Sequence, residues 1–103
     1  MPSSLDPISP EAAYRQLDGH PAWIVERDRI RRDLRMASFR DAIAVIGRVA
    51  EVAEAVGHQP NICIHEGGFV RFELYTHLHN AISQRDVDLA LALDVVLKAA
   101  SAA

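Results

Sequence analysis

The sequence is short of the features that mark several common classes of protein. Its one cysteine, Cys63, cannot form a disulfide within the chain, which fits a reducing compartment. No apolar run approaches the roughly 20 residues that span a bilayer, and residues 1–10 lack the basic start and apolar run of a signal peptide. The formal net charge of -3 argues against a nucleic-acid partner, which would favour a basic face. We therefore expect a small cytoplasmic protein without a membrane or nucleic-acid partner.

The usual signatures of metal and nucleophile chemistry are also missing. His77 and His79 alternate along an extended segment, but there is no His-Glu-x-x-His, second cysteine or carboxylate at ligand spacing, so we expect no metal site. No serine lies in a Gly-x-Ser-x-Gly context, and Cys63 fits a small apolar residue in an alternating strand. The chain does have five histidines, and histidine is the side chain best suited to proton transfer near pH 7. Acid–base chemistry is what remains, with His58 at a helix end and His77 at a strand end as candidates.

Hydrophobic periodicity predicts one domain over residues 10–103, preceded by a proline-rich, flexible lead-in over residues 1–9. Helical spacing and caps predict helices over residues 10–17, 39–56 and 84–100. Alternation predicts two strand pairs, 23–25 with 30–36 and 62–64 with 70–76, joined by turns at 27–28 and 66–68. The order α-β-β-α-β-β-α predicts an α+β fold, in which a four-stranded antiparallel sheet has its helices packed on one face. The basic cluster over residues 27–35 is interrupted by acids and predicts a solvated strand face.

Three short motifs together resemble the pterin-4a-carbinolamine dehydratase family. That family carries Glu-x-x-x-His-His-Pro, then Thr-His, then Ser/Thr-x-x-Asp at the start of the last helix. The matching stretches are E-A-V-G-H-Q-P over residues 54–60, T-H over residues 76–77 and S-Q-R-D over residues 83–86. Upstream, W-I-V-E-R-D-R-I-R-R-D-L-R and F-R-D-A fall at the expected distances. The resemblance covers residues 17–96.

The resemblance implies an activity and a set of site residues. The family removes water from 4a-hydroxytetrahydropterin to give the quinonoid dihydropterin, in the regeneration of tetrahydrobiopterin for the aromatic amino acid hydroxylases. It implies that His58 and His77 are the two main proton-transfer residues, and that the pterin is the substrate, with no separate cofactor. The implied substrate-binding residues are Gln59, Pro60, Trp23, Thr76 and Asp86, of which Asp86 also fits a helix cap.

Two departures from the family pattern keep a second hypothesis open. Gln59 replaces the family's second histidine, and an amide can form hydrogen bonds but cannot exchange a proton. The hairpin over residues 64–66 lacks the family's aromatic residue. The alternative is a catalytically degenerate dehydratase-like protein that binds a protein partner, as a RuBisCO assembly factor or a coactivator does. In either case the family implies a homodimer or homotetramer, and an uncovered sheet edge invites pairing with a second copy.

Overall fold

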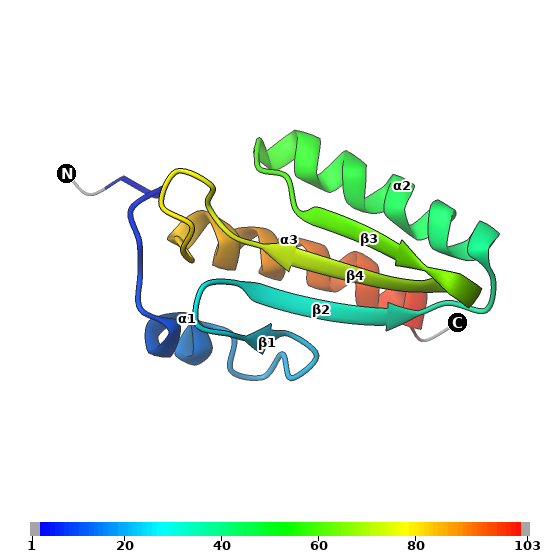
Figure 1. Ribbon diagram of the computed structural model, residues 1–103, viewed down its shortest axis with the longest axis horizontal. Coiled ribbons are helices and arrows are strands. Elements are labelled where there is room, and N and C mark those ends of the chain that lie inside the picture. Colours follow the sequence, from blue (N-terminus) through cyan, green and yellow to red (C-terminus); the bar gives the residue numbers. More distant parts are fainter. Residues whose placement is uncertain (1–2, 102–103) are drawn as a thin grey trace.

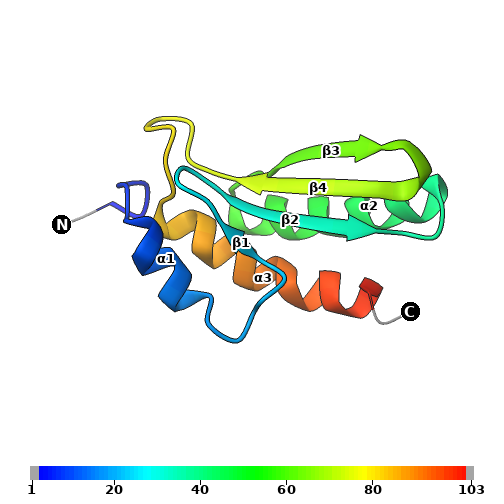
Figure 2. The same ribbon diagram turned by 60° about the horizontal axis from the view of Figure 1, so that its bottom comes forward.

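The computed structural model describes residues 3–101 and has the predicted order of elements (Figure 1). The helices are α1 (Pro10–Gln16), α2 (Phe39–Val56) and α3 (Gln84–Ser101), and the strands are β1 (Ile24–Val25), β2 (Ile30–Arg35), β3 (Asn61–His65) and β4 (Phe69–Leu74). A short 3₁₀ segment, η1 (Glu66–Gly68), joins β3 to β4. The sheet is antiparallel in the order β1-β2-β4-β3. Figure 2 shows the helices on one face of this sheet, which confirms the α+β prediction.

The core lies between the sheet and the helices because the strands alternate. Val70, Phe72 and Leu74 of β4 are buried, whereas the residues between them are half-buried on the open face. Helix α3 supplies the largest share of the facing apolar side chains, including Leu89, Leu93 and Leu97. Burial of such side chains is worth roughly 1.5–3 kcal/mol each.

The ends of α2 follow local rules that were visible in the sequence. The Ser38 side chain accepts a hydrogen bond from the Asp41 amide at 3.1 Å, which caps the first turn. Gly57 ends the helix in the left-handed conformation with φ of 72°, where glycine carries no side-chain penalty. The chain then turns directly into β3, so residues 58–60 lie immediately before that strand.

The β3–β4 hairpin brings two distant motifs to one end of the sheet. Asn61 at the start of β3 pairs with Glu73 near the end of β4. Residues 58–60, which precede β3, therefore lie at the same sheet end as residues 75–77, which follow β4. This register creates the site described below.

The prediction of a solvated face for residues 27–35 is wrong at Arg32. Its neighbours Arg31 and Asp33 lie on the open face, but Arg32 is 3% exposed and shares the helix side of β2 with Ile30 and Leu34. A period of two requires this placement. The guanidinium is tolerated there because it pairs with a carboxylate of α3.

The segment predicted as a flexible lead-in contacts the start of α3. The Ile8 amide donates to the Ile82 carbonyl at 2.9 Å, and the Arg85 amide donates to the Ser4 carbonyl at 3.2 Å. Residues 1–2 lie outside the described residues, and the flexibility of the lead-in stays a prediction. Among residues 3–101, no helix is both long enough and apolar enough to span a membrane.

Candidate active site

His58 is fixed from two directions just beyond the end of α2. Its amide donates to the Ala53 carbonyl at 3.2 Å, continuing the capping pattern of Gly57. Its ring Nε2 lies 2.5 Å from Asp86 Oδ1. The other ring nitrogen, Nδ1, has no hydrogen-bond partner within the described chain. The tautomer that satisfies this contact carries its proton on Nε2, which leaves the Nδ1 lone pair available as a base.

Asp86 is completely buried and divides its two oxygens between two tasks. Oδ2 accepts from the Ser83 amide at 2.8 Å, which is the helix-capping role that the sequence predicted. The same oxygen accepts from the Thr76 hydroxyl at 2.9 Å. Oδ1 is left for His58. The cap and the histidine contact therefore coexist in one carboxylate.

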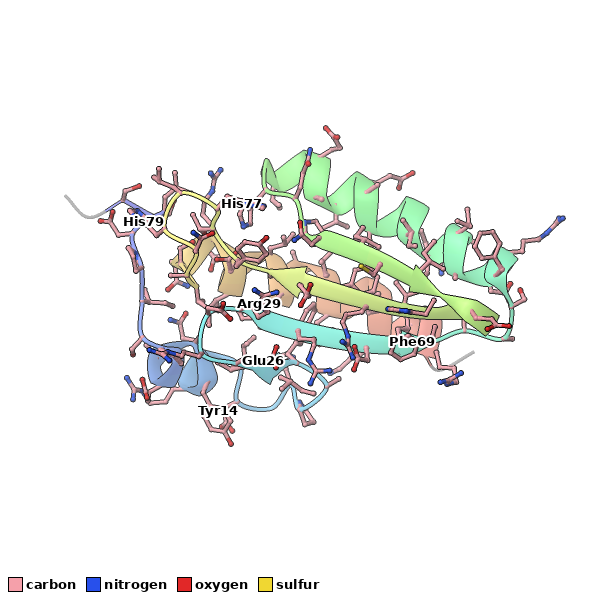
Figure 3. The ribbon with its side chains drawn as sticks, in the orientation of Figure 1. Tyr14, Glu26, Arg29, Phe69, His77 and His79 are labelled. Atoms are coloured by element: carbon pink, nitrogen blue, oxygen red, sulfur yellow. The ribbon has the colours of Figure 1, made fainter. Side chains whose placement is uncertain are left out.

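The predicted site residues largely converge on one surface hollow of about 380 Å³. Both histidines line it, His58 with its side chain 13% exposed and His77 more open to solvent. Its other lining residues are Gln59, Pro60, Ala53, Glu54, Gly57 and Asn61. Figure 3 shows His77 at the end of the sheet, with His79 farther along the following loop. Two proton-exchanging side chains thus share one cavity with polar amide groups.

Three predicted residues, Asp86, Thr76 and Trp23, do not line this hollow, although Asp86 contacts one of its histidines. Thr76 is buried behind Asp86, so it supports the carboxylate. Trp23 is 4% exposed and precedes β1, which lies at the opposite edge of the sheet from β3. Its Nε1 donates to Asp94 Oδ1 at 3.2 Å, and it lines a different hollow that includes His20. The structure therefore does not bring Trp23 together with His58 and His77.

Asp94 forms a second buried carboxylate centre that the sequence analysis did not identify. It accepts from Arg32 Nη1 at 2.8 Å, and its Oδ2 lies 2.8 Å from His20 Nδ1. Burial alone would raise the pKa of Asp94, but the hydrogen bonds from His20, Arg32 and Lys98 together lower it below the ordinary value. The sequence did contain an indication of this centre. A charged residue, Arg32, stands among the apolar positions of its strand, and another, Asp94, stands among those of its helix.

Asn61 and Tyr75 are also part of the site region and were missed. Each flanks a motif directly, Asn61 after Pro60 and Tyr75 before Thr76. The Asn61 side-chain amide donates to the Tyr75 hydroxyl at 3.0 Å. Adjacency to a motif was the only signal that could have found them.

The chemistry available here is proton transfer. Among residues 3–101, no three His, Cys, Asp or Glu side chains are grouped so that they could hold a metal ion. A histidine oriented by a buried carboxylate is a well-attested general base arrangement. A second histidine on the same hollow can serve the complementary acid role.

The protein has an α+β fold with two histidines beside one hollow at one end of the sheet, and comparisons with known proteins give its family. Residues 6–96 match the family described as Pterin 4 alpha carbinolamine dehydratase. The chain belongs to the pterin-4a-carbinolamine dehydratase family.

Individual relatives support the same assignment. A provisionally named pterin-4-alpha-carbinolamine dehydratase of Acidobacterium capsulatum is 36% identical over 90 residues, covering 87% of this chain and 97% of the relative. One from Chloroflexus aggregans is 41% identical over 91 residues, covering 87% and 96%. The crystal structure of a transcriptional coactivator/pterin dehydratase from Brucella melitensis has a TM-score of 0.75 at 20% identity, covering 89% of this chain and 99% of that one. This last likeness supports the fold.

Proposed function

We propose that the protein is a lyase that dehydrates 4a-hydroxytetrahydropterin to the quinonoid dihydropterin, and so helps to regenerate tetrahydrobiopterin. The observation that carries the proposal is that His58, oriented by Asp86, and His77 line one hollow. Membership of the dehydratase family supports the same reaction.

The reaction needs two proton transfers, which the two histidines can divide. The bond between C4a and its hydroxyl oxygen breaks while a C4a–N5 double bond forms, so N5 loses a proton and the hydroxyl leaves as water. We assign the base role to His58, because the buried Asp86 carboxylate contacts its ring and orients it. His77 then supplies the proton to the leaving hydroxyl. Each positioned transfer contributes roughly 10²–10⁴-fold to the rate.

The remaining polar groups of the hollow suit the amide edge of a pterin. The Gln59 side chain both donates and accepts hydrogen bonds, and so does that of Asn61. Pro60 fixes the backbone φ angle between them. We assign these residues to substrate binding and orientation.

A dehydration assay tests the proposal directly. The purified protein should accelerate dehydration of 4a-hydroxytetrahydropterin above the buffer rate, and His58→Ala and His77→Ala should each remove most of the acceleration. His79→Ala is the matched control, because His79 lies in the same loop as His77 but does not line the hollow. Equal rates with and without the protein would refute the proposal.

A protein-binding role is the second candidate function, and two observations favour it. Gln59 stands where the family has a second proton-exchanging histidine. Large apolar side chains are exposed on two helices, Phe39 at 61% and Ile43 at 48% on α2 and Val95 at 73% on α3. A purified partner that binds the wild-type protein and the His58→Ala/His77→Ala variant equally would favour this function, provided that the wild-type protein has no dehydratase activity.

We also propose that the protein acts in the cytoplasm as a homodimer or homotetramer. β3 is an edge strand of the sheet, and an edge with free backbone groups pairs readily with another copy. Light scattering on the purified protein should give two or four times the monomer mass, and a monomer at micromolar concentration would contradict the assembly.

A further inference from the structure

His77 is exposed, yet its ring has a defined neighbour. Within residues 3–101 the ring forms no hydrogen bond or ion pair, but it packs against Tyr75 with ring centres 4.5 Å apart and planes at 50°. An exposed side chain without such a neighbour exchanges among its rotamers on the nanosecond timescale. The contact with Tyr75 therefore restricts the His77 ring.

Tyr75 is itself held at two points. Its hydroxyl accepts a hydrogen bond from Asn61 Nδ2 at 3.0 Å, and Asn61 lines the hollow. The guanidinium carbon of Arg29 lies 5.0 Å from the centre of its ring, within the range of a cation–π interaction. The ring is thus braced from β3 and from the turn that precedes β2.

Arg29 is fixed in turn by two carboxylates. Its Nη1 donates to Glu73 Oε2 at 2.8 Å, and its Nε and Nη2 contact the two oxygens of Asp28 at 3.1 and 3.3 Å. The hydrogen bonds that Arg29 donates to Asp28 and Glu73 raise the pKa of Arg29 above its already high value. Figure 3 shows Arg29 and His77 at the same end of the sheet. A continuous line of contacts therefore runs from Arg29 through Tyr75 to the ring of His77.

We propose that Tyr75 is a positioning residue, which holds the imidazole of His77 in the orientation that protonates the leaving hydroxyl. This inference rests on the proposed dehydratase function and deepens it. Proton transfer requires near-contact geometry, and a misplacement of about 1 Å can cost on the order of 100-fold in rate. The competing explanation is that Tyr75 only stabilises the sheet, and it predicts different results in the following experiments.

The first experiment measures whether Tyr75 acts through His77. Tyr75→Leu should lower kcat about 10-fold with little change in KM, because orientation is lost while the hollow is kept. Tyr75→Phe should retain most of the activity, because the ring is kept. In a His77→Ala background, Tyr75→Leu should have no further effect. The inference would be overturned if Tyr75→Leu lowered kcat equally in the wild-type and His77→Ala backgrounds, or if it did not lower kcat in the wild-type background.

The second experiment reads the position of His77 without using activity. The imidazole proton resonances of His77 should carry a ring-current shift in the wild type and in Tyr75→Phe, and should lose it in Tyr75→Leu. Tyr14→Leu is the matched control, because Tyr14 is an exposed tyrosine on α1, away from the hollow (Figure 3). An unchanged shift in Tyr75→Leu contradicts the positioning role. If Tyr75→Leu loses the ring-current shift but the wild-type protein has no dehydratase activity, the proposed function is refuted. The contact between Tyr75 and His77 would then still be confirmed.

Discussion

Asp86 and Asp94 stand eight residues apart on α3, and both are buried carboxylates in contact with a histidine. Asp86 Oδ1 lies 2.5 Å from His58 Nε2, and Asp94 Oδ2 lies 2.8 Å from His20 Nδ1. If only the contact between carboxylate and histidine is compared, the two centres are equivalent. They differ in their surroundings, because His58 shares its hollow with a second histidine, whereas His20 shares its hollow with no other histidine among residues 3–101.

The more informative difference is how each negative charge is compensated. Asp94 pairs with Arg32, which is charged at all relevant pH values, and with Lys98 at 3.4 Å. In the part of the chain that the structure describes, His58 is the one partner of Asp86 that can take up a positive charge, and its other donors are neutral. A carboxylate balanced by arginine stabilises the fold whatever the state of its histidine. A carboxylate balanced only by histidine couples its charge to a proton, which is what acid–base catalysis requires.

Replacing each carboxylate by an amide should give the largest difference in kcat between the two centres. In Asp86→Asn the amide oxygen can still accept from the Ser83 amide, but the amide nitrogen then faces His58 Nε2. The ring must become an acceptor at Nε2, so its proton moves to Nδ1 and the base is lost. We expect kcat to fall roughly 10²–10⁴-fold, as for other carboxylate-oriented histidines.

The matched variant is Asp94→Asn, which changes the same group on the same helix. It should lower kcat only slightly, although it destabilises the protein. Kinetics and urea unfolding on both variants provide the measurement. Similar losses of kcat in the two variants would show that the distinction between the centres is wrong.

Removing the arginine partner should break the structural centre. Arg32→Met keeps an apolar stem under the sheet but leaves Asp94 with His20, Lys98 and the indole N–H of Trp23. Loss of one partner of a buried ion pair costs about 3 kcal/mol or more in the free energy of unfolding. Arg31→Met, on the open face of the same strand, should cost no more than about 1 kcal/mol. Urea titrations measure both values, and comparable costs would mean that burial of Arg32 adds nothing to stability.

Local patterns in the sequence predicted most of the fold and the part of the site that is encoded in short motifs. Ser38 and Gly57 mark the ends of α2 through hydrogen bonds and backbone conformations that depend on few neighbours. Alternation in β4 assigned its buried face. The motif over residues 54–60 and His77 of the Thr-His pair pointed to residues that do line one hollow, because the hairpin register brings them together.

The features that the sequence did not predict depend on contacts between distant segments. The alternation of side chains along β2 places Arg32 on the buried face. The fold can bury this charge only because Arg32 pairs with Asp94, which lies 62 residues away in the sequence. Trp23 matched a family motif, yet its indole N–H donates to the same carboxylate, 71 residues away on α3. The contact between Asn61 and Tyr75 crosses from β3 to the end of β4, and no motif includes either residue.

Restoring the family's second histidine should sharpen the functional side of the comparison. Gln59→His adds a proton-exchanging group to the hollow beside His58, while the Asp94 centre is untouched. We expect dehydration to become roughly 10-fold faster, less than the contribution of a main proton-transfer residue. Assays on the wild type and the variant at equal enzyme concentration provide the comparison. A slower variant would show that Gln59 contributes a hydrogen bond to the substrate that histidine cannot replace.

The smallest expected effect is the pH dependence of the Asp94 centre. Its pKa lies below the ordinary value of 3.8, so its ionised form stabilises the folded state at higher pH. That contribution is fully present above the ordinary value and is lost as the pH falls through the folded-state pKa. The Asp94→Asn variant lacks this pH-dependent contribution. Asp28 and Asp33 also have lowered pKa values, but both proteins contain them, so their contributions cancel in the comparison.

The wild type and Asp94→Asn should therefore differ in their free energy of unfolding by a constant amount near neutral pH. This difference, the stability gap, should become smaller in acid. The slope from one carboxyl group cannot exceed about 1.4 kcal/mol per pH unit. Urea unfolding of both proteins at a series of pH values on either side of 3.8 measures the gap. A gap that stays constant to the lowest pH at which both proteins fold would mean that Asp94 has the same pKa in the folded and unfolded states, so that its ionised form adds nothing to stability.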